Sequence, residues 1–147
     1  MKQGICSAVG LVSGAIASAF GGWDAALMTL TIFMLIDYFS GIICAGVFHA
    51  SQKSESGALE SKAGFKGLAR KGMQLLIVLV ACRLDILIGT QTFIRDAVVV
   101  AFITNETISI VENAGLMGVP MPKAVTRAIE VLKQKEEQEE AINEQQG

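Results

Sequence analysis

The stretch that decides the fold is residues 25–48, "AALMTLTIFMLIDYFSGIICAGVF". Within it, Asp37 is the one ionisable side chain that a bilayer would strongly disfavour, and it lies close to the midpoint. A run of about 20 mostly apolar residues is long enough to cross the hydrocarbon core as a helix. The stretch therefore predicts a membrane-spanning helix that carries a carboxyl group near its centre.

The composition of the whole chain is typical of a membrane protein. Of the 147 residues, 52% are hydrophobic and 18% are charged, whereas soluble domains carry about a quarter charged residues. Further apolar segments lie at about 5–23, 72–93 and 97–119. We expect an all-α integral membrane protein in which residues 1–119 form three to four transmembrane helices, arranged as two helical hairpins.

The first apolar segment has more than one interpretation. Because it is rich in Gly, Ala and Ser, it could span the membrane or lie along the interface. The small residues from Ala15 to Ala19 also fit a signal-peptide cleavage site. Its packing pattern favours a retained segment, and the downstream apolar segments indicate a membrane protein in either case.

Basic residues predict the orientation. The segment 50–71, expected to be a loop, contains Lys53, Lys62, Lys66, Arg70 and Lys71, so the positive-inside rule places it in the cytoplasm. Residues 120–147, which begin at a proline and become charged, are predicted to form a cytoplasmic helix or tail. The residues expected at the membrane surface are Trp23, Lys62, Lys66, Arg70 and Lys71.

Polar side chains interrupt the apolar segments. A charged group at the centre of a spanning helix costs about 2.5–3.5 kcal/mol on insertion scales, so such groups should face protein or water. Tyr38 is expected to be a hydrogen-bond partner of Asp37, and Arg83 either pairs with an acid to fix helix packing or takes part in function. The predicted pore or helix-contact residues are Asp37, Tyr38, Arg83, Asp85, Asn105 and Glu106.

Small residues recur every four positions in two segments. Such stripes let helix backbones approach closely in membranes, either between subunits or within one chain. We expect a homo-oligomer that uses one or both stripes. The stripe residues are Gly10, Gly14, Ser18 and Gly22 in the first segment, and Gly41 and Ala45, which follow Asp37, in the second.

The sequence contains no pattern typical of an enzyme. It has no glycine-rich phosphate loop, no Ser/His/Asp set and no metal-ligand spacing. Cys6, Cys44 and Cys82 lie in apolar stretches and are expected to be small buried residues, and His49 is the only histidine. A net charge of −2 gives no argument for nucleic-acid binding. We therefore expect no catalysis, no cofactor and no metal.

Three stretches in order, "FGGWDAALMTLTIFMLIDYFSGI", "KAGFKGLARKG" and "NETISIVENAGLMGVPMP", followed by a charged helix, resemble the phage lysis and toxin-secretion holin family. The resemblance implies a small phage- or prophage-encoded protein of the bacterial cytoplasmic membrane. It further implies oligomerisation into lesions that release an endolysin or a toxin. The positions matching the family pattern are Gly21, Gly22, Trp23, Asp37, Tyr38, Gly41, Gly64, Phe65, Lys66, Gly67, Asn105, Glu106, Glu112, Asn113, Gly118 and Pro120.

Two other functions remain open at the level of sequence. The chain could be a small ion or proton channel that uses Asp37, Asp85 and Glu106 as a relay. It could also be a membrane scaffold whose polar residues only pack helices. Lesion size separates the first alternative from a holin, and toxicity on expression separates the second.

Overall fold

The computed structural model describes residues 2–131 and 134, with the backbone alone for residues 2–6 and 8. The described chain is all-helical, as predicted. Its helices are α1 (Lys2–Ala19), α2 (Ala25–Gly46), α3 (Ser61–Ile88) and α4 (Phe93–Leu116), and residues 123–131 are also helical. The Cys6 side chain and most of the predicted tail beyond residue 131 lie outside the described residues.

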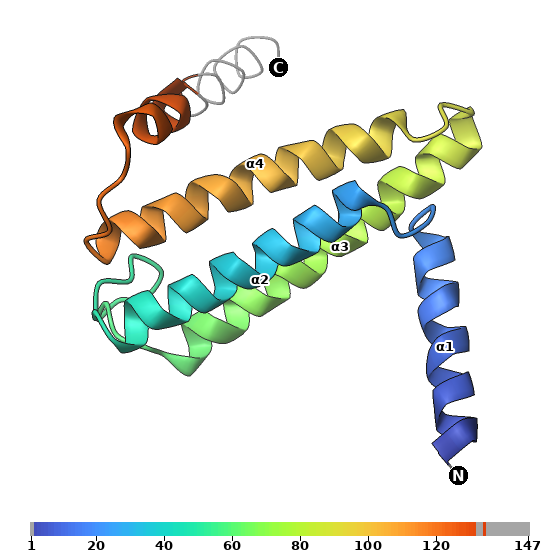
Figure 1. Cartoon of the computed structure of the whole chain (residues 1–147), viewed down its shortest axis with the longest axis horizontal. Helices are drawn as coiled ribbons and strands as arrows, with labels where there is room; N and C mark the ends of the chain where they lie inside the picture. The colour runs from blue at the N-terminus through green and yellow to red at the C-terminus, as the bar shows by residue number, and fades with distance from the viewer. Residues whose placement is uncertain (1, 132–133, 135–147) are drawn as a thin grey trace.

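Helices α2, α3 and α4 form a three-helix bundle in which α4 packs against both of the others. Figure 1 shows α1 leaving this bundle at a steep angle, with the N-terminus far from the other helices. The prediction of two hairpins is therefore wrong for the first pair, because α1 does not fold back along α2. The second predicted hairpin, α3 with α4, is present.

The break between α1 and α2 has a local cause. Gly21 and Gly22 both have positive φ, at 75° and 103°, a region that glycine adopts without the steric penalty of a Cβ. Asp24 then caps α2, since its Oδ1 accepts a hydrogen bond of 2.9 Å from the Leu27 amide. Gly22 thus belongs to a turn, so the predicted small-residue stripe of the first segment ends at Ser18.

The turn between α3 and α4 is closed by one carboxylate. Gly89 ends α3 in the left-handed conformation, with φ 81°. The Asp85 carboxylate accepts hydrogen bonds from the amides of Ile94, at 2.9 Å, and Arg95, at 2.8 Å. These amides lie in the first turn of α4, whose N–H groups lack partners within the helix. Asp85 is therefore the acceptor that fixes where α4 starts.

Helix α3 begins earlier than predicted. It starts at Ser61, so most of the basic residues expected in the 50–71 loop lie on a helix. Glycine is a poor helix former, and the early part of α3 contains two glycines, Gly64 and Gly67. In the structure Tyr38 of α2 packs beside them: a Cβ placed on Gly64 would lie 3.9 Å from the Tyr38 hydroxyl, and one placed on Gly67 would lie 4.0 Å from the Tyr38 ring. Close packing thus offsets the low helix propensity.

The centre of the bundle is apolar. Buried side chains from all three helices form the core, with Phe20 packed at its edge. Cys44 and Cys82 are buried free thiols, as predicted. The core residues are Leu27, Leu30, Met34, Val78, Cys82 and Val99.

Among the described helices, α2 is the one that is both long and apolar enough to cross a membrane. Charged residues reduce the apolar character of α3 and α4, so the predicted three to four spans are supported for α2 only. The outer surface of α2 is nevertheless strongly apolar, with Leu35 and Phe39 more than half exposed. A surface of this kind is suited to lipid or to another protein.

We predict that Gly89→Ala destabilises the bundle by about 1 kcal/mol, because alanine disfavours the left-handed conformation. No atom lies within 4 Å of the added Cβ, so strain in the backbone is the only expected cause. Unfolding in mixed detergent micelles, followed by circular dichroism, measures the change. The control is Gly72→Ala in the same helix, which also has an unobstructed Cβ and should stabilise by about 0.5–1 kcal/mol. Equal effects at both positions would contradict the prediction.

Candidate functional site

One lysine joins the three helices of the bundle. Lys71 of α3 donates a hydrogen bond of 2.7 Å to Asp37 Oδ2 of α2 and a second bond to Glu106 Oε2 of α4. The three side chains are 13%, 7% and 4% exposed, respectively. An ion pair this well buried loses its hydration and must recover that free energy from its partners. The contact therefore fixes which faces of α2, α3 and α4 meet.

Two further residues complete this group, which we call the Lys71 cluster: Asp37, Lys71, Glu106, Asn113 and Lys53. Asn113 of α4 donates bonds of 3.1 Å to Asp37 Oδ1 and 2.9 Å to Ser40 Oγ. Lys53, from the segment that links α2 to α3, lies 3.3 Å from Asp37 Oδ1 and is half exposed. Asp37 thus has partners on every element around it.

The predicted stripe on α2 is used inside the chain. The Asn113 amide nitrogen lies 3.7 Å from the position that a Cβ would take on Gly41. Ala45 is buried, one turn further along. The small side chains at 41 and 45 therefore leave room for α4 to pack on the face of α2 that carries Asp37. They also line the cavity beside that face.

A cavity of about 160 Å³ lies beside the Lys71 cluster. Residues of α2, α3, α4 and the 51–60 segment line it, and Gln74 Oε1 is buried there without a partner among the described atoms. Since a water molecule takes about 30 Å³ in the liquid and needs polar partners, the cavity can hold several waters. Tyr38 lines its wall and makes no hydrogen bond with Asp37, so that prediction is wrong.

A second charged group, the Arg95 cluster, lies at the other end of α4 and comprises Arg95, Asp24 and Asp96. The Arg95 guanidinium is 2% exposed and its Nη1 donates to Asp24 Oδ2, at 2.6 Å, and Asp96 Oδ1, at 3.1 Å. The Arg95 bond is the main reason that the pKa of Asp24 is lowered to about 2. This cluster joins the start of α4 to the start of α2.

Two predicted site residues do not face the bundle interior. Arg83 is exposed and makes no ion pair with any residue that the structure describes. The buried positions of α3 include Val78, Cys82 and Asp85, and the next residue after Cys82 is turned away by about 100°. Asn105 is exposed at the rim of the cavity. Arg83 therefore does not pair with the acids that it was expected to neutralise.

The acids proposed as a relay lie at two separate levels of the bundle, with Asp37 and Glu106 near the middle of their helices and Asp85 near the end of α3. Asp37 and Glu106 share Lys71, whereas Asp85 is bound in the α3–α4 turn. The 14 residues from Lys71 to Asp85 span about 21 Å of helix. The apolar core lies between these two levels.

The predicted surface residues are exposed, except Lys71. Lys62, Lys66 and Arg70 are exposed on α3, and Trp23 is 51% exposed in the turn before α2. On α1, Gly10, Gly14 and Ser18 are exposed, with no atom within 4 Å of a Cβ placed on either glycine. That stripe has no partner within the described chain.

Sequence reasoning missed the bridging role of Lys71 and the whole Arg95 cluster. Lys71 was assigned to the membrane surface because it lay in an expected loop. On a helix that starts at residue 61, Lys71, Gln74 and Val78 follow at spacings of three and four, on the face that is buried. The helical period was the signal that could have identified Lys71.

Comparison with known proteins adds the family. The sequence profile of the bacteriophage holin family matches residues 14–134, which include both clusters. The chain belongs to this family. Holins are non-enzymatic membrane proteins, so membership also associates the chain with a membrane. No solved structure matches the chain.

Several bacterial and phage proteins are similar to this holin-family chain. An uncharacterized Clostridium perfringens protein is 37% identical over 117 residues, covering 79% of this chain and 83% of the relative. An uncharacterized Listeria innocua protein is 36% identical over 121 residues, covering 82% and 81%. A protein of Bacillus phage phi105, named a probable holin, is 28% identical over 109 residues, covering 74% and 75%.

We predict that Lys71→Met lowers the free energy of unfolding by about 3 kcal/mol, because it leaves the Asp37 and Glu106 carboxylates buried without their shared cation. Thermal unfolding in detergent micelles, followed by circular dichroism, measures the change. Lys66→Met is the matched control, since Lys66 is exposed on the same helix, and should change stability by less than about 0.5 kcal/mol. Similar effects for the two variants would show that the ion pairs do not hold the bundle.

A pH dependence is predicted at the Arg95 cluster. Because the folded pKa of Asp24 is about 2, below its ordinary 3.8, the ion pair stabilises the fold above about pH 4 and loses this effect as the pH falls through 2. Asp24 is 48% exposed, so solvent screening reduces the contribution to about 1 kcal/mol. Asp24→Asn, which can still cap α2, should lower the free energy of unfolding by this amount at pH 6 and leave it unchanged near pH 2. A difference independent of pH would contradict the assignment.

Proposed function

We propose that the chain is a holin that oligomerises in the bacterial cytoplasmic membrane. There it would form lesions through which an endolysin, or a toxin, leaves the cytoplasm. The observation that carries the proposal is a buried charged cluster on an apolar, membrane-length helix, within a chain of the holin family. In such a protein the polar groups are buried in the closed form and would line a water-filled lesion after the helices rearrange.

The closed form of this mechanism is the three-helix bundle. Asp37, Lys71 and Glu106 satisfy one another within one chain, while the outer surface of α2 is apolar. Such a molecule can accumulate in a membrane without exposing charge to lipid. It would not conduct in this state, because the core between the two charged clusters is closely packed.

The open form would exchange contacts within a chain for contacts between chains. Separation of α4 from α2 and α3 uncovers Asp37 and Lys71 on one side and Glu106 with Asn113 on the other. Polar groups of this kind are tolerated at membrane depth where they line water. An oligomer with these faces toward a lumen would form a wet lesion.

Helix α1 is suited to assembly. It makes few contacts with the bundle (Figure 1), and its exposed Gly10, Gly14 and Ser18 form a surface on which a second helix can pack closely. Gly41 and Ala45 are occupied within the closed form and become available only if α4 leaves. Assembly would therefore begin at α1 and extend to the Asp37 face on opening.

The basic end of α3 would lie at the cytoplasmic surface. Lys62, Lys66 and Arg70 follow one another at intervals of four, so they share a helix face, and Phe65 beside them is 73% exposed. Each cation near an anionic leaflet adds about 1 kcal/mol of attraction. This placement puts the segment between α2 and α3, residues 47–60, and the C-terminal tail in the cytoplasm.

A small ion or proton channel is the second candidate. The polar-lined cavity beside Asp37 and Glu106, with the Gln74 side-chain oxygen that has no partner among the described atoms, favours it. Asp85, however, would not take part, since it is bound in the turn between α3 and α4, beyond the apolar core. The two functions differ in the size of the species that crosses the membrane.

The decisive experiment is induced expression in bacteria that contain a cytosolic reporter enzyme, with membrane potential and released enzyme activity followed together. We expect a delay, then an abrupt loss of potential accompanied by enzyme release. Loss of potential without release would reject the holin and support the ion channel. No effect on either would support a scaffold.

The same assay tests the Lys71 cluster. Asp37→Asn removes one of the two carboxylates that bind Lys71, which weakens the closed form, so we expect lysis to begin earlier. Glu55→Gln is the control, because Glu55 is an exposed acid of the segment between α2 and α3. If both variants lyse at the parent time, the Lys71 cluster does not keep the protein closed.

A further inference from the structure

Arg83 is an unpaired cation on an apolar surface. It is exposed on α3, and its neighbours on that face, Val80, Leu84 and Leu87, are 57%, 40% and 81% exposed. Among the described residues its guanidinium makes no ion pair and no hydrogen bond. A guanidinium surrounded by aliphatic side chains in a membrane needs an anion to neutralise it.

The surface around Arg83 is hollowed into a groove. It lies where the end of α1 meets α3, and Ala19 contributes its α1 side. The groove has a volume of about 380 Å³, and Arg83 is its one charged lining residue. Its lining residues are Ala19, Leu79, Val80, Arg83, Leu84 and Leu87.

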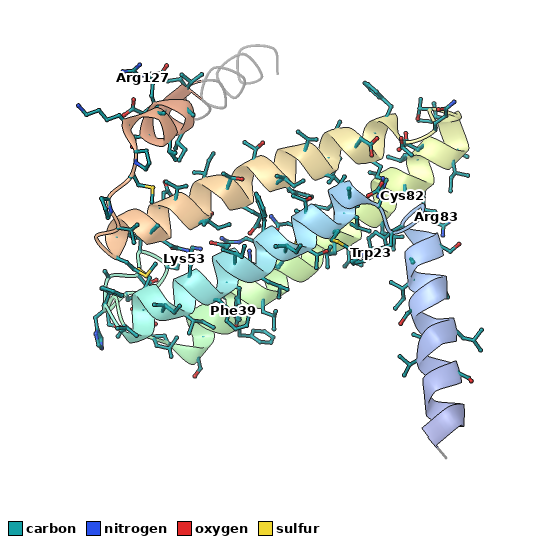
Figure 2. The ribbon with its side chains drawn as sticks, in the orientation of Figure 1. Trp23, Phe39, Lys53, Cys82, Arg83 and Arg127 are labelled. Atoms are coloured by element: carbon teal, nitrogen blue, oxygen red, sulfur yellow. The ribbon has the colours of Figure 1, made fainter. Side chains whose placement is uncertain are left out.

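The groove is close to one end of the bundle. Arg83 lies five residues before the end of α3 at Ile88, which is about 7.5 Å along the helix. The turn after α1 is held against the same part of α3, because Cys82 Sγ donates a hydrogen bond of 3.2 Å to the Phe20 carbonyl oxygen. Figure 2 shows Trp23 and Arg83 where α1 meets α3. An exposed tryptophan is typical of the membrane–water interface.

We propose that this groove binds an anionic phospholipid. One acyl chain lies along Leu79, Val80, Leu84 and Leu87, and the phosphate is bound by Arg83. A guanidinium matches phosphate oxygens with two parallel N–H donors. A molecule with an aliphatic chain and an anionic group at one end matches both the aliphatic lining of the groove and the positive charge of Arg83.

A second copy of the chain fits the groove less well. The helix most available for such a contact is α1, since it is unpartnered along most of its length (Figure 1). Its sequence from Lys2 to Ala19 contains no acidic residue, so it brings no carboxylate to Arg83. Charge complementarity therefore favours the lipid.

This inference uses the membrane location of the proposed function but not the formation of lesions. It can be tested on purified full-length protein, without lysis. Trp23 is the only tryptophan of the chain and is close to the groove, so its fluorescence reports bromine atoms on a nearby acyl chain. The protein is reconstituted in phosphatidylcholine discs that contain increasing fractions of brominated phosphatidylglycerol.

We expect Trp23 to be quenched at a lower fraction of brominated phosphatidylglycerol than of brominated phosphatidylcholine. Arg83→Gln should raise the fraction needed for half-maximal quenching about fivefold, the factor expected for one cation near an anionic lipid. Arg83→Lys keeps the charge and should stay within about twofold of the parent. Arg127→Gln, an exposed cation on the helix after α4, should leave quenching unchanged.

Equal quenching by the two brominated lipids in the parent chain would overturn the proposal. So would parent-like quenching by Arg83→Gln. If Arg83→Gln instead reduces the mass of the detergent-solubilised oligomer while leaving quenching unchanged, the groove belongs to a second copy. None of these results bears on enzyme release in the lysis assay, so failure here is distinguishable from failure of the holin proposal.

Discussion

One ammonium group between two carboxylates holds the bundle together. Lys71 is the only contact by which α3 neutralises both Asp37 of α2 and Glu106 of α4 within the described structure. Burying three charged groups is unfavourable unless each is paired, so the arrangement tolerates little displacement of any helix. Apolar packing between the helices is less directional than these bonds. The cluster therefore specifies the relative rotation of the helices, while the core supplies most of the burial.

The bundle consequently carries charge near its middle and at one end, with the apolar core between the two. Near the middle, the Lys71 cluster joins α2, α3 and α4. At the end, Arg95 and Asp85 join the start of α4 to its neighbours. Helix α4 takes part in both, so it is the element whose position depends most on charge. For a protein proposed to change from a closed to an open form, this makes α4 the natural moving part.

The sequence was informative where a single physical rule applied. The apolar run of α2 predicted a membrane-length helix, and the cost of an isolated charge predicted that Asp37 and Glu106 face inward, as they do. It was uninformative where the outcome depended on contacts distant in sequence. The sequence predicted a loop for residues 61–71, where the structure has the start of α3 packed beside Tyr38. Arg95 was overlooked because its partner Asp24 lies 71 positions earlier.

The order of residues along the chain also bears on how the protein is made. Asp37 emerges from the ribosome 34 residues before its partner Lys71, a delay of about 2–7 s at a synthesis rate of about 5–20 residues per second. During that interval α2 carries an unneutralised carboxylate, which opposes its release into lipid by about 2.5–3.5 kcal/mol. For a chain that spans the membrane as proposed, we expect α2 to stay at the insertion machinery until α3 arrives, so that the two enter the bilayer as a pair. The buried ion pair would then couple membrane insertion to the progress of translation.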